Sequence, residues 1–282
     1  MRIMLFQGSP RRANNCPDQW GKTKLLAEHI MEYAPADVDI DYCDLSVSPE
    51  TTIQPCKGCV STANGFHCHY RCDCYTSNAV DPRLSDYMHD ADIYGRMERS
   101  DGFLFLTPIN WYSTSSQLKL LFDRLSCINL TITSDQAREL GINKNAIKSA
   151  AAEQSGKYHH LLKNHYEGKF AAFFIHGDAG GSDYYEFAKK KKSYLPRLPL
   201  AYTQHSTPDG YAGRIDDPRN AIMNLVWQCR YSGIFVPEDL IEGYNATKGI
   251  CYSKSMELAI TNLQEFYDRG LDLLLRLRNH LI

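Results

Sequence analysis

Cysteines are concentrated in one short part of this 282-residue chain. Five of the ten cysteines lie between positions 56 and 74, and a Cys-x2-Cys pair opens the group. Thiolates bind zinc tetrahedrally and also hold iron–sulfur clusters. Because spacing alone does not choose between zinc, an iron–sulfur cluster, a redox-active disulfide and plain thiols, all four stay open. The pattern predicts a local site rather than a disulfide framework, and the expected metal ligands are Cys56, Cys59, Cys68 and Cys72.

A second group of polar residues follows the first apolar run, Ile3–Phe6. Gly8-Ser9-Pro10-Arg11 brings backbone N–H groups, a hydroxyl and a guanidinium to one turn, and Gly21-Lys22-Thr23 opens the next predicted helix. A phosphate at such a turn is stabilised by the helix dipole and by charge-assisted hydrogen bonds. A nucleotide P-loop is excluded, because Cys16 stands where that motif needs glycine. The alternative is an ordinary helix start, capped by Thr23, with the arginines in solvent.

Two further apolar runs also end in polar and turn-forming residues. Gly102–Leu106 leads into Thr107-Pro108-Ile109-Asn110-Trp111, and Phe170–Ile175 leads into a stretch from His176 to Gly181 that holds three glycines, Gly177, Gly180 and Gly181. Glycines allow a planar ligand to approach the backbone closely. Two other readings stay open here: Trp111 packs in the core, and His176 is a strand-end histidine with satisfied hydrogen bonds.

The elements that position these residues alternate between short apolar runs and amphipathic stretches. This alternation predicts a parallel sheet with helices on both faces, an α/β doubly wound fold of flavodoxin-like strand order 2-1-3-4-5. Ligands in such folds bind at the carboxyl ends of the strands, where we expect all three polar corners and the cysteine group. The expected strands are 3–6, 38–42, 102–106, 170–175 and 233–236, and the expected helices are 24–31, 82–97, one from Ser115, and 256–281.

We expect residues 1–282 to form a single domain with additions to the minimal fold. These additions are a cysteine-rich loop at 46–80 and insertions at about 129–168 and 182–220. Long segments near a ligand edge commonly act as lids, substrate walls or subunit contacts.

The stretch from Asp101 to Lys119, followed by Asp123-Arg124, resembles the signature of the NADPH-dependent FMN reductase family, a branch of the flavodoxin-like superfamily. The resemblance covers roughly residues 1–127 and includes the Gly8–Arg11 turn. It implies that the FMN phosphate binds Ser9, Arg11 and Thr23. It also implies that the flavin ring lies beside Thr107, Pro108, Ile109, Asn110, Trp111, Gly177, Asp178 and Gly181. Asn110 stands where the family usually has tyrosine, and Asp123-Arg124 is expected to be structural.

The resemblance implies an FMN-dependent NAD(P)H oxidoreductase that passes electrons to a quinone, nitroaromatic, flavin or similar small-molecule acceptor. Flavin chemistry needs little from the protein beyond placement, so no catalytic acid or base is assigned. The Cys-x2-Cys start also resembles the iron–sulfur flavoproteins, which implies the alternative of a 4Fe–4S electron-transfer protein served by a ferredoxin. A third possibility is a non-enzymatic, redox-sensing flavin-binding module.

Composition argues against two classes of binding partner, nucleic acids and membranes. Lys plus Arg total 31 against 33 Asp plus Glu, a net charge of −2, which argues against nucleic-acid binding. No apolar run reaches the roughly 18 residues of a membrane span, and the first residues do not form a signal peptide, so we expect a cytoplasmic protein. A flavin at a sheet edge is only partly covered by one subunit, so we expect a homodimer or homotetramer.

Overall fold

The computed structural model describes residues 1–13, 20–58, 68, 70–72, 74–75, 85–110, 113–139, 159–177, 218–245 and 256–282. Its sheet runs in the order β2-β1-β3-β5-β6, with β4 paired to β3. The bounds are β1 Arg2–Gln7, β2 Asp39–Asp44, β3 Gly102–Asn110, β4 Ser113–Thr114, β5 Phe170–Gly177 and β6 Ile241–Asn245. All five strands on the main path pair in parallel, and β4 is antiparallel. The flavodoxin-like α/β fold predicted from the sequence is therefore confirmed.

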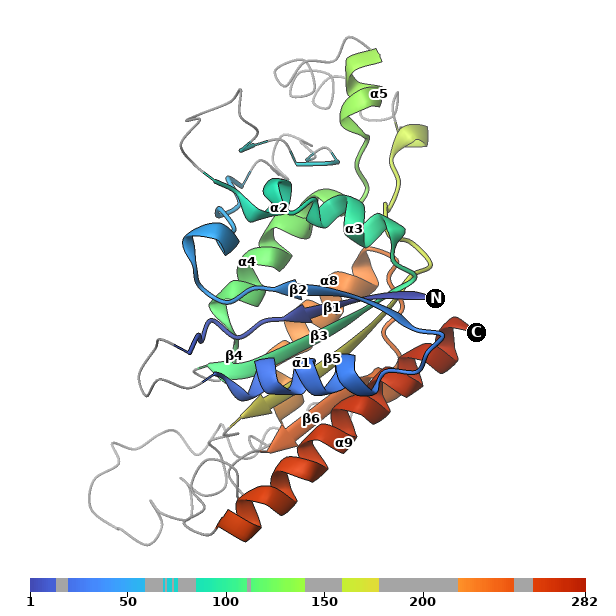
Figure 1. Ribbon diagram of the computed structural model, residues 1–282. Coiled ribbons are helices and arrows are strands. Elements are labelled where there is room, and N and C mark those ends of the chain that lie inside the picture. The colour runs from blue at the N-terminus through green and yellow to red at the C-terminus, as the bar shows by residue number, and fades with distance from the viewer. Residues whose placement is uncertain are drawn as a thin grey trace, which may run out of the picture.

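Helices cover both faces of the sheet (Figure 1). Helices α1 (Lys22–Tyr33) and α9 (Met256–Leu281) lie on one face. The other face carries α2 (Tyr87–Asp90), α3 (Ile93–Arg99), α4 (Ser116–Arg124) and α8 (Met223–Tyr231), while α5 (Ser134–Glu139) stands further out. Short 3-10 turns complete the order at Pro49–Thr51, Leu125–Ile128, His159–Leu161, Pro218–Ile222 and Glu238–Leu240.

Burial explains why the apolar runs are continuous rather than alternating. Side chains of β3 and β5 are buried on both sheet faces, and they belong to two separate hydrophobic clusters. Phe105 and Phe173 stack with ring centroids 5.0 Å apart on the α4 side, whereas Phe174 meets Phe266 of α9 on the other. Burying each such ring contributes about 1.5–3 kcal/mol.

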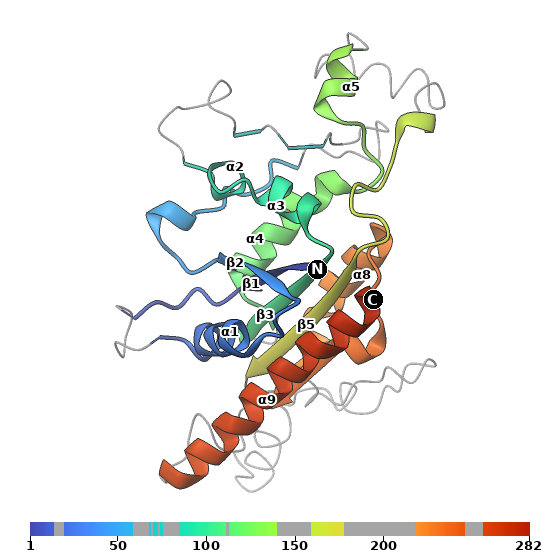
Figure 2. The ribbon, with the colours of Figure 1, turned by 45° about the vertical axis from the view of Figure 1, so that its right-hand side comes forward.

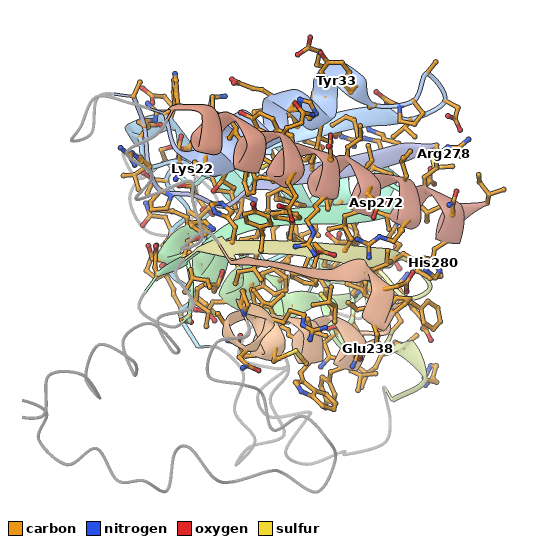
Figure 3. The ribbon with its side chains drawn as sticks, turned by 90° about the horizontal axis from the view of Figure 1, so that it is seen from below. Lys22, Tyr33, Glu238, Asp272, Arg278 and His280 are labelled. Atoms are coloured by element: carbon orange, nitrogen blue, oxygen red, sulfur yellow. The ribbon has the colours of Figure 1, made fainter. Side chains whose placement is uncertain are left out.

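Helix α9 crosses its face of the sheet beside α1 (Figures 2 and 3). Seen from below, Lys22 lies toward one end of this face and Arg278 and His280 toward the other. Arg278 pairs with Asp37 at 2.8 Å, and His280 Nε2 lies 2.9 Å from an Asp239 oxygen. These contacts attach the last turn of α9 to loops at the amino ends of the strands. No helix in the described ranges is both long and apolar enough to cross a bilayer.

Two predicted elements differ from the structure. The fifth strand expected at 233–236 is wrong: Gly233 has φ +76° in the turn after α8, Phe235 makes only an isolated bridge to Phe170, and the strand proper is β6. The helix expected at 82–97 is two helices, because Asp92 adopts φ +46° between them. Its first residues, 82–84, lie outside the described residues.

Candidate active site

The first loop at the carboxyl edge of the sheet is held by Gln7, the last residue of β1. Gln7 is fully buried; its side-chain oxygen accepts a hydrogen bond from the Ser9 N–H, and its amide donates to Asp44 at 3.2 Å. The Gly8 N–H donates to the Leu106 carbonyl at 2.8 Å, and a Cβ on Gly8 would lie 2.9 Å from that oxygen. Only glycine allows β1 and β3 to end so close together.

Ser115 joins this loop to the second corner. Its hydroxyl donates to the Gly8 carbonyl and accepts from the Leu118 N–H at 3.2 Å, so it caps α4. The Thr107 hydroxyl, at the end of β3, lies 3.1 Å from that of Thr114 in β4. The loop after β1 and the corner after β3 therefore form one hydrogen-bonded unit.

The amino end of α1 has the features of an anion site. Its N-cap is Gly21, with no side-chain cap, and its first turn has no acidic residue. A Cβ on Gly21 would lie 3.2 Å from Ser9 Oγ and 3.4 Å from Arg11 Cβ, so all three pack together. Arg11 Nε is buried with no hydrogen-bond partner in the described part of the chain. A buried donor beside an uncapped helix start fits the phosphate group of FMN.

Thr23, which the resemblance assigns to the phosphate, is the second residue of α1 and is 1% exposed. Its hydroxyl lies 2.8 Å from Nε2 of His176, near the end of β5. The alternative in which Thr23 caps the helix is wrong, because Gly21 holds that position. Burial, together with the charge of Lys22, lowers the pKa of His176 to about 3. His176 is therefore a neutral strand-end histidine that connects β5 to α1.

The ring corner lies on the adjacent ends of β3 and β5. Pro108 and Ile109 are half-buried and Asn110 is exposed. Gly177 has φ +153°, and a Cβ there would lie 3.2 Å from the Ile109 nitrogen. The two corners are thus in contact, as the sequence predicted. Three further predicted ring contacts, Trp111, Asp178 and Gly181, lie outside the described residues.

Three of the clustered cysteines meet in the structure. The thiols of Cys68 and Cys74 hydrogen-bond Cys72, and these two contacts hold the pKa of Cys72 far below its usual range. Cys56 has its sulfur 4.0 Å from the Ser126 hydroxyl, and Cys59 lies outside the described residues. Within the described ranges, no three or more Cys, His, Asp or Glu side chains are arranged to hold a metal ion. Of the alternatives that the sequence leaves open, a zinc or iron–sulfur site is therefore not supported.

The position expected for this cysteine group is wrong. Cys72 faces Arg124 at the far end of α4, and the Cys127 thiol donates to the Arg124 carbonyl at 3.4 Å. Nearby, Tyr70 reaches Tyr166, just before β5, with the two hydroxyls 3.1 Å apart. Figures 1 and 2 place the described pieces of this loop outside α2 and α4. The described cysteines of this loop therefore lie by the helical layer, away from the ligand edge.

Arg124 anchors this second region. It is 1% exposed and pairs with the buried Asp86 at 2.9 Å, while its other terminal nitrogen donates to the Gln54 carbonyl at 3.0 Å. Asp123 instead pairs with Lys119 one turn away on the surface of α4. Asp123-Arg124 is thus structural, as expected, although the two residues do not pair with each other.

Sequence reasoning missed two residues of the carboxyl edge. In the sequence, Gln7 is a polar residue directly after an apolar run, a position from which a side chain can hydrogen-bond the following loop. Ser115 was visible as a serine at the start of an apolar helical pattern, the signature of an N-cap. Neither signal says which carbonyl or amide the side chain reaches, because those partners come from other strands.

The chain is similar to a known protein family and to several solved structures. The sequence matches the family model of NADPH-dependent FMN reductase over residues 1–183. A similar solved structure is an azoreductase from Bacillus anthracis, with 12% identity, 96% of this chain and 99% of that chain covered, and a TM-score of 0.47. Another is general stress protein 14 from Treponema denticola in complex with FMN, at 11% identity, 100% and 98% coverage, and a TM-score of 0.42. A search of curated proteins returned no match.

The matched region contains the whole of β1 to β5, including the phosphate loop and both corners of the carboxyl edge. It spans well over half of the chain. The chain therefore belongs to the NADPH-dependent FMN reductase family and is an FMN-dependent NAD(P)H oxidoreductase.

Proposed function

We propose that the chain reduces a small planar acceptor, such as a quinone, a nitroaromatic or free flavin, with electrons from NAD(P)H, by way of FMN bound at the carboxyl edge. The observation that supports this proposal is that a phosphate site and a flat apolar corner lie side by side. An uncapped helix start, with the buried Arg11 Nε that has no partner among the described residues, lies beside the corner formed by Pro108, Ile109 and Gly177. The first part suits a phosphate and the second suits a flat ring.

Each residue of the site helps to position FMN. Ser9 and Arg11 donate to the phosphate, with the N–H groups at the start of α1. Gln7 and Ser115 hold the loop that carries these donors. When bound, FMN supplies the redox chemistry by accepting a hydride and passing two electrons on.

The corner after β3 orients the ring. Pro108 and Ile109 offer half-buried apolar surface to it, and the exposed side-chain amide of Asn110 can hydrogen-bond its polar edge. Gly177 leaves the backbone of β5 without a side chain at its closest approach to Ile109. We assign no catalytic acid or base, because placement of donor, ring and acceptor is sufficient for hydride transfer.

We further propose that a second copy of the chain completes the site, as a homodimer or homotetramer. The exposed Asn110 at the ring corner supports this, since the described residues leave that side of the corner open to solvent. Light scattering after gel filtration, with and without FMN, tests it. A single mass of about one chain in both samples would contradict the proposal.

Electron entry from a ferredoxin has no supporting observation in the described ranges. A cluster held by the cysteines would lie by Arg124, at the opposite end of α4 from Ser115. Those two residues are about 14 Å apart along the helix. A cysteine-bound cluster would therefore not touch a ring at the carboxyl edge.

Titration of the purified chain with FMN tests the proposal. We expect quenching of flavin fluorescence at one FMN per chain. At a hundredfold excess over Kd, FMN should stabilise the fold by about 2.7 kcal/mol, which raises Tm by about 5 °C or more. Oxidation of NADPH should then require FMN and accelerate with benzoquinone. If FMN changes neither fluorescence nor Tm, the proposed function is wrong.

A further inference from the structure

We propose that His176 is a positioning residue: it fixes the Thr23 hydroxyl as a donor toward phosphate, and so makes the site prefer phosphorylated flavin over flavin without phosphate. This inference rests on the proposed function of the carboxyl edge. It assigns a role to a contact that the sequence did not predict, between residues 153 positions apart.

The contact is fixed from both sides. Thr23 is 1% exposed and His176 is 6% exposed, and their Oγ1 and Nε2 atoms are 2.8 Å apart. The imidazole packs edge-on against Phe266 of α9, with centroids 5.1 Å apart, and lies 6.4 Å from the Phe174 ring. Packing on two sides restricts rotation of the imidazole, so its Nε2 stays directed at Thr23.

Thr23 is also close to the anion site. It follows Gly21 by two residues, and Gly21 packs against Ser9 and Arg11. Because Thr23 lies in the first turn of α1, no preceding turn offers its hydroxyl a carbonyl. Among the described residues, the hydrogen-bond partner of this hydroxyl is His176.

Proton counting decides what Thr23 can offer a phosphate. A threonine hydroxyl has one hydrogen, and a neutral imidazole has one N–H. His176 is neutral, because burial holds its pKa at about 3. If Nε2 carries the hydrogen, His176 donates to Thr23, and the Thr23 hydrogen is released for the phosphate. If Nδ1 carries it, Thr23 must donate to Nε2 and presents only oxygen lone pairs to the anion. The proposal therefore requires the Nε2–H tautomer when phosphate is bound.

Paired titrations with FMN and riboflavin test this, because the two differ only in the phosphate. Thr23→Val should weaken FMN binding about 10- to 100-fold, the loss of one charge-assisted hydrogen bond. Its riboflavin affinity should change less than about twofold. His176→Phe keeps an aromatic ring at this position without a donor, and should lower the FMN-to-riboflavin preference about tenfold.

The matched variant is His176→Gln, whose amide can place a donor near the position of Nε2. It should restore most of the preference that His176→Phe loses. The double variant Thr23→Val/His176→Phe should discriminate no worse than Thr23→Val alone, because His176 acts through Thr23. Two-bond proton–nitrogen spectra of the histidine rings should show the Nε2–H tautomer for His176 in the FMN complex.

Outcomes separate this inference from the proposed function. If the unaltered chain binds no FMN, the proposed function fails. If it binds FMN but His176→Phe weakens FMN and riboflavin equally, His176 has a structural role only and the inference is overturned. An Nδ1–H tautomer in the FMN complex also overturns it. A lowered preference, rescued by glutamine, supports it.

Discussion

The carboxyl edge of the sheet and the cysteine group at the far end of α4 are built in different ways. At the carboxyl edge, the ends of β1, β2, β3 and β5 meet the starts of α1 and α4. Side chains join these elements: Gln7 reaches β2, Ser115 reaches Gly8, and His176 reaches Thr23. At the cysteine group, neighbouring residues of one loop contact one another, Cys72 faces Arg124, and the Tyr70 hydroxyl bonds Glu98 and Tyr166. The first site is fixed by the sheet, whereas the second is attached to the helical layer by side-chain contacts, the buried Arg124 among them.

This difference teaches which functional sites a sequence can reveal. Parallel strands must end at the same edge, so polar residues after successive apolar runs converge whatever lies between them. A long loop between a strand and a helix has no such constraint. Its cysteines can gather anywhere that a neighbouring element offers a partner.

The largest expected effect tests how far the stability of the fold depends on Arg124. Arg124→Met leaves the Asp86 carboxylate buried and without its main cation, and breaking such a pair costs about 3–5 kcal/mol. Urea unfolding should show this loss, and Cys72 should become faster to alkylate. The control is Asp123→Asn on the exposed side of α4, expected to change stability by about 0.5 kcal/mol or less. A small effect of Arg124→Met would mean that other contacts hold the cysteine group.

The second effect concerns two histidines: the buried His176 at the carboxyl edge, and the half-buried His165, which stacks on Tyr70 beside the cysteine group with ring centroids 4.0 Å apart. Burial lowers the pKa of His176 to about 3 and, despite a hydrogen bond to Thr131, that of His165 to about 4. In the unfolded chain both imidazoles have a pKa near 6.5. As the pH falls below that value, the unfolded state binds protons that the native state does not bind. Stability should therefore decrease with falling pH, by up to about 1.4 kcal/mol per pH unit for each histidine.

Unfolding by urea between pH 6.5 and pH 5 measures this slope, above the range in which unfolded carboxyl groups titrate. His176→Gln and His165→Gln should each remove about half of it. Equal slopes in the unaltered chain and in both variants would mean that the two imidazoles are protonated in the native state. If only one variant has a smaller dependence of stability on pH, the histidine replaced in that variant is the one that stays unprotonated in the native state.

The fold and the carboxyl edge could be predicted because their signals are local. Continuous apolar runs gave the strands, and Gly8–Arg11 and Thr107–Asn110 stood directly after them. The fifth strand was misplaced because Ile234-Phe235-Val236 is as apolar as a strand. Phe235 makes a single bridge to Phe170 at the start of β5. Pro237 and the 3-10 turn Glu238–Leu240 follow, so β6 begins only at Ile241. The Thr23–His176 contact and the place of the cysteines depend on tertiary packing, which residue spacing does not encode.

The third effect concerns binding rather than stability. Arg11→Met should weaken FMN binding about 10- to 100-fold, because it removes the guanidinium whose Nε lacks a partner in the described part of the chain. The control is Arg12→Met: Arg12 donates to Ser46 at 3.2 Å, and its loss should weaken FMN binding only slightly. Fluorescence titration measures both. If the two variants bind FMN equally, the assignment of Arg11 to the phosphate is wrong.

The smallest effect is expected for Cys72→Ser, and it tests the separation of the two regions directly. The cysteine group contacts Arg124 and Cys127, about 14 Å along α4 from Ser115, so serine should leave FMN affinity and NADPH oxidation within about twofold. Urea unfolding of the same variant supplies the control, since loss of the sulfur beside Arg124 changes local stability without touching the carboxyl edge. Dialysis against a chelator should likewise leave flavin reduction unchanged. If Cys72→Ser slows flavin reduction while the fold keeps its stability, the two regions are coupled, and the contrast drawn between them is wrong.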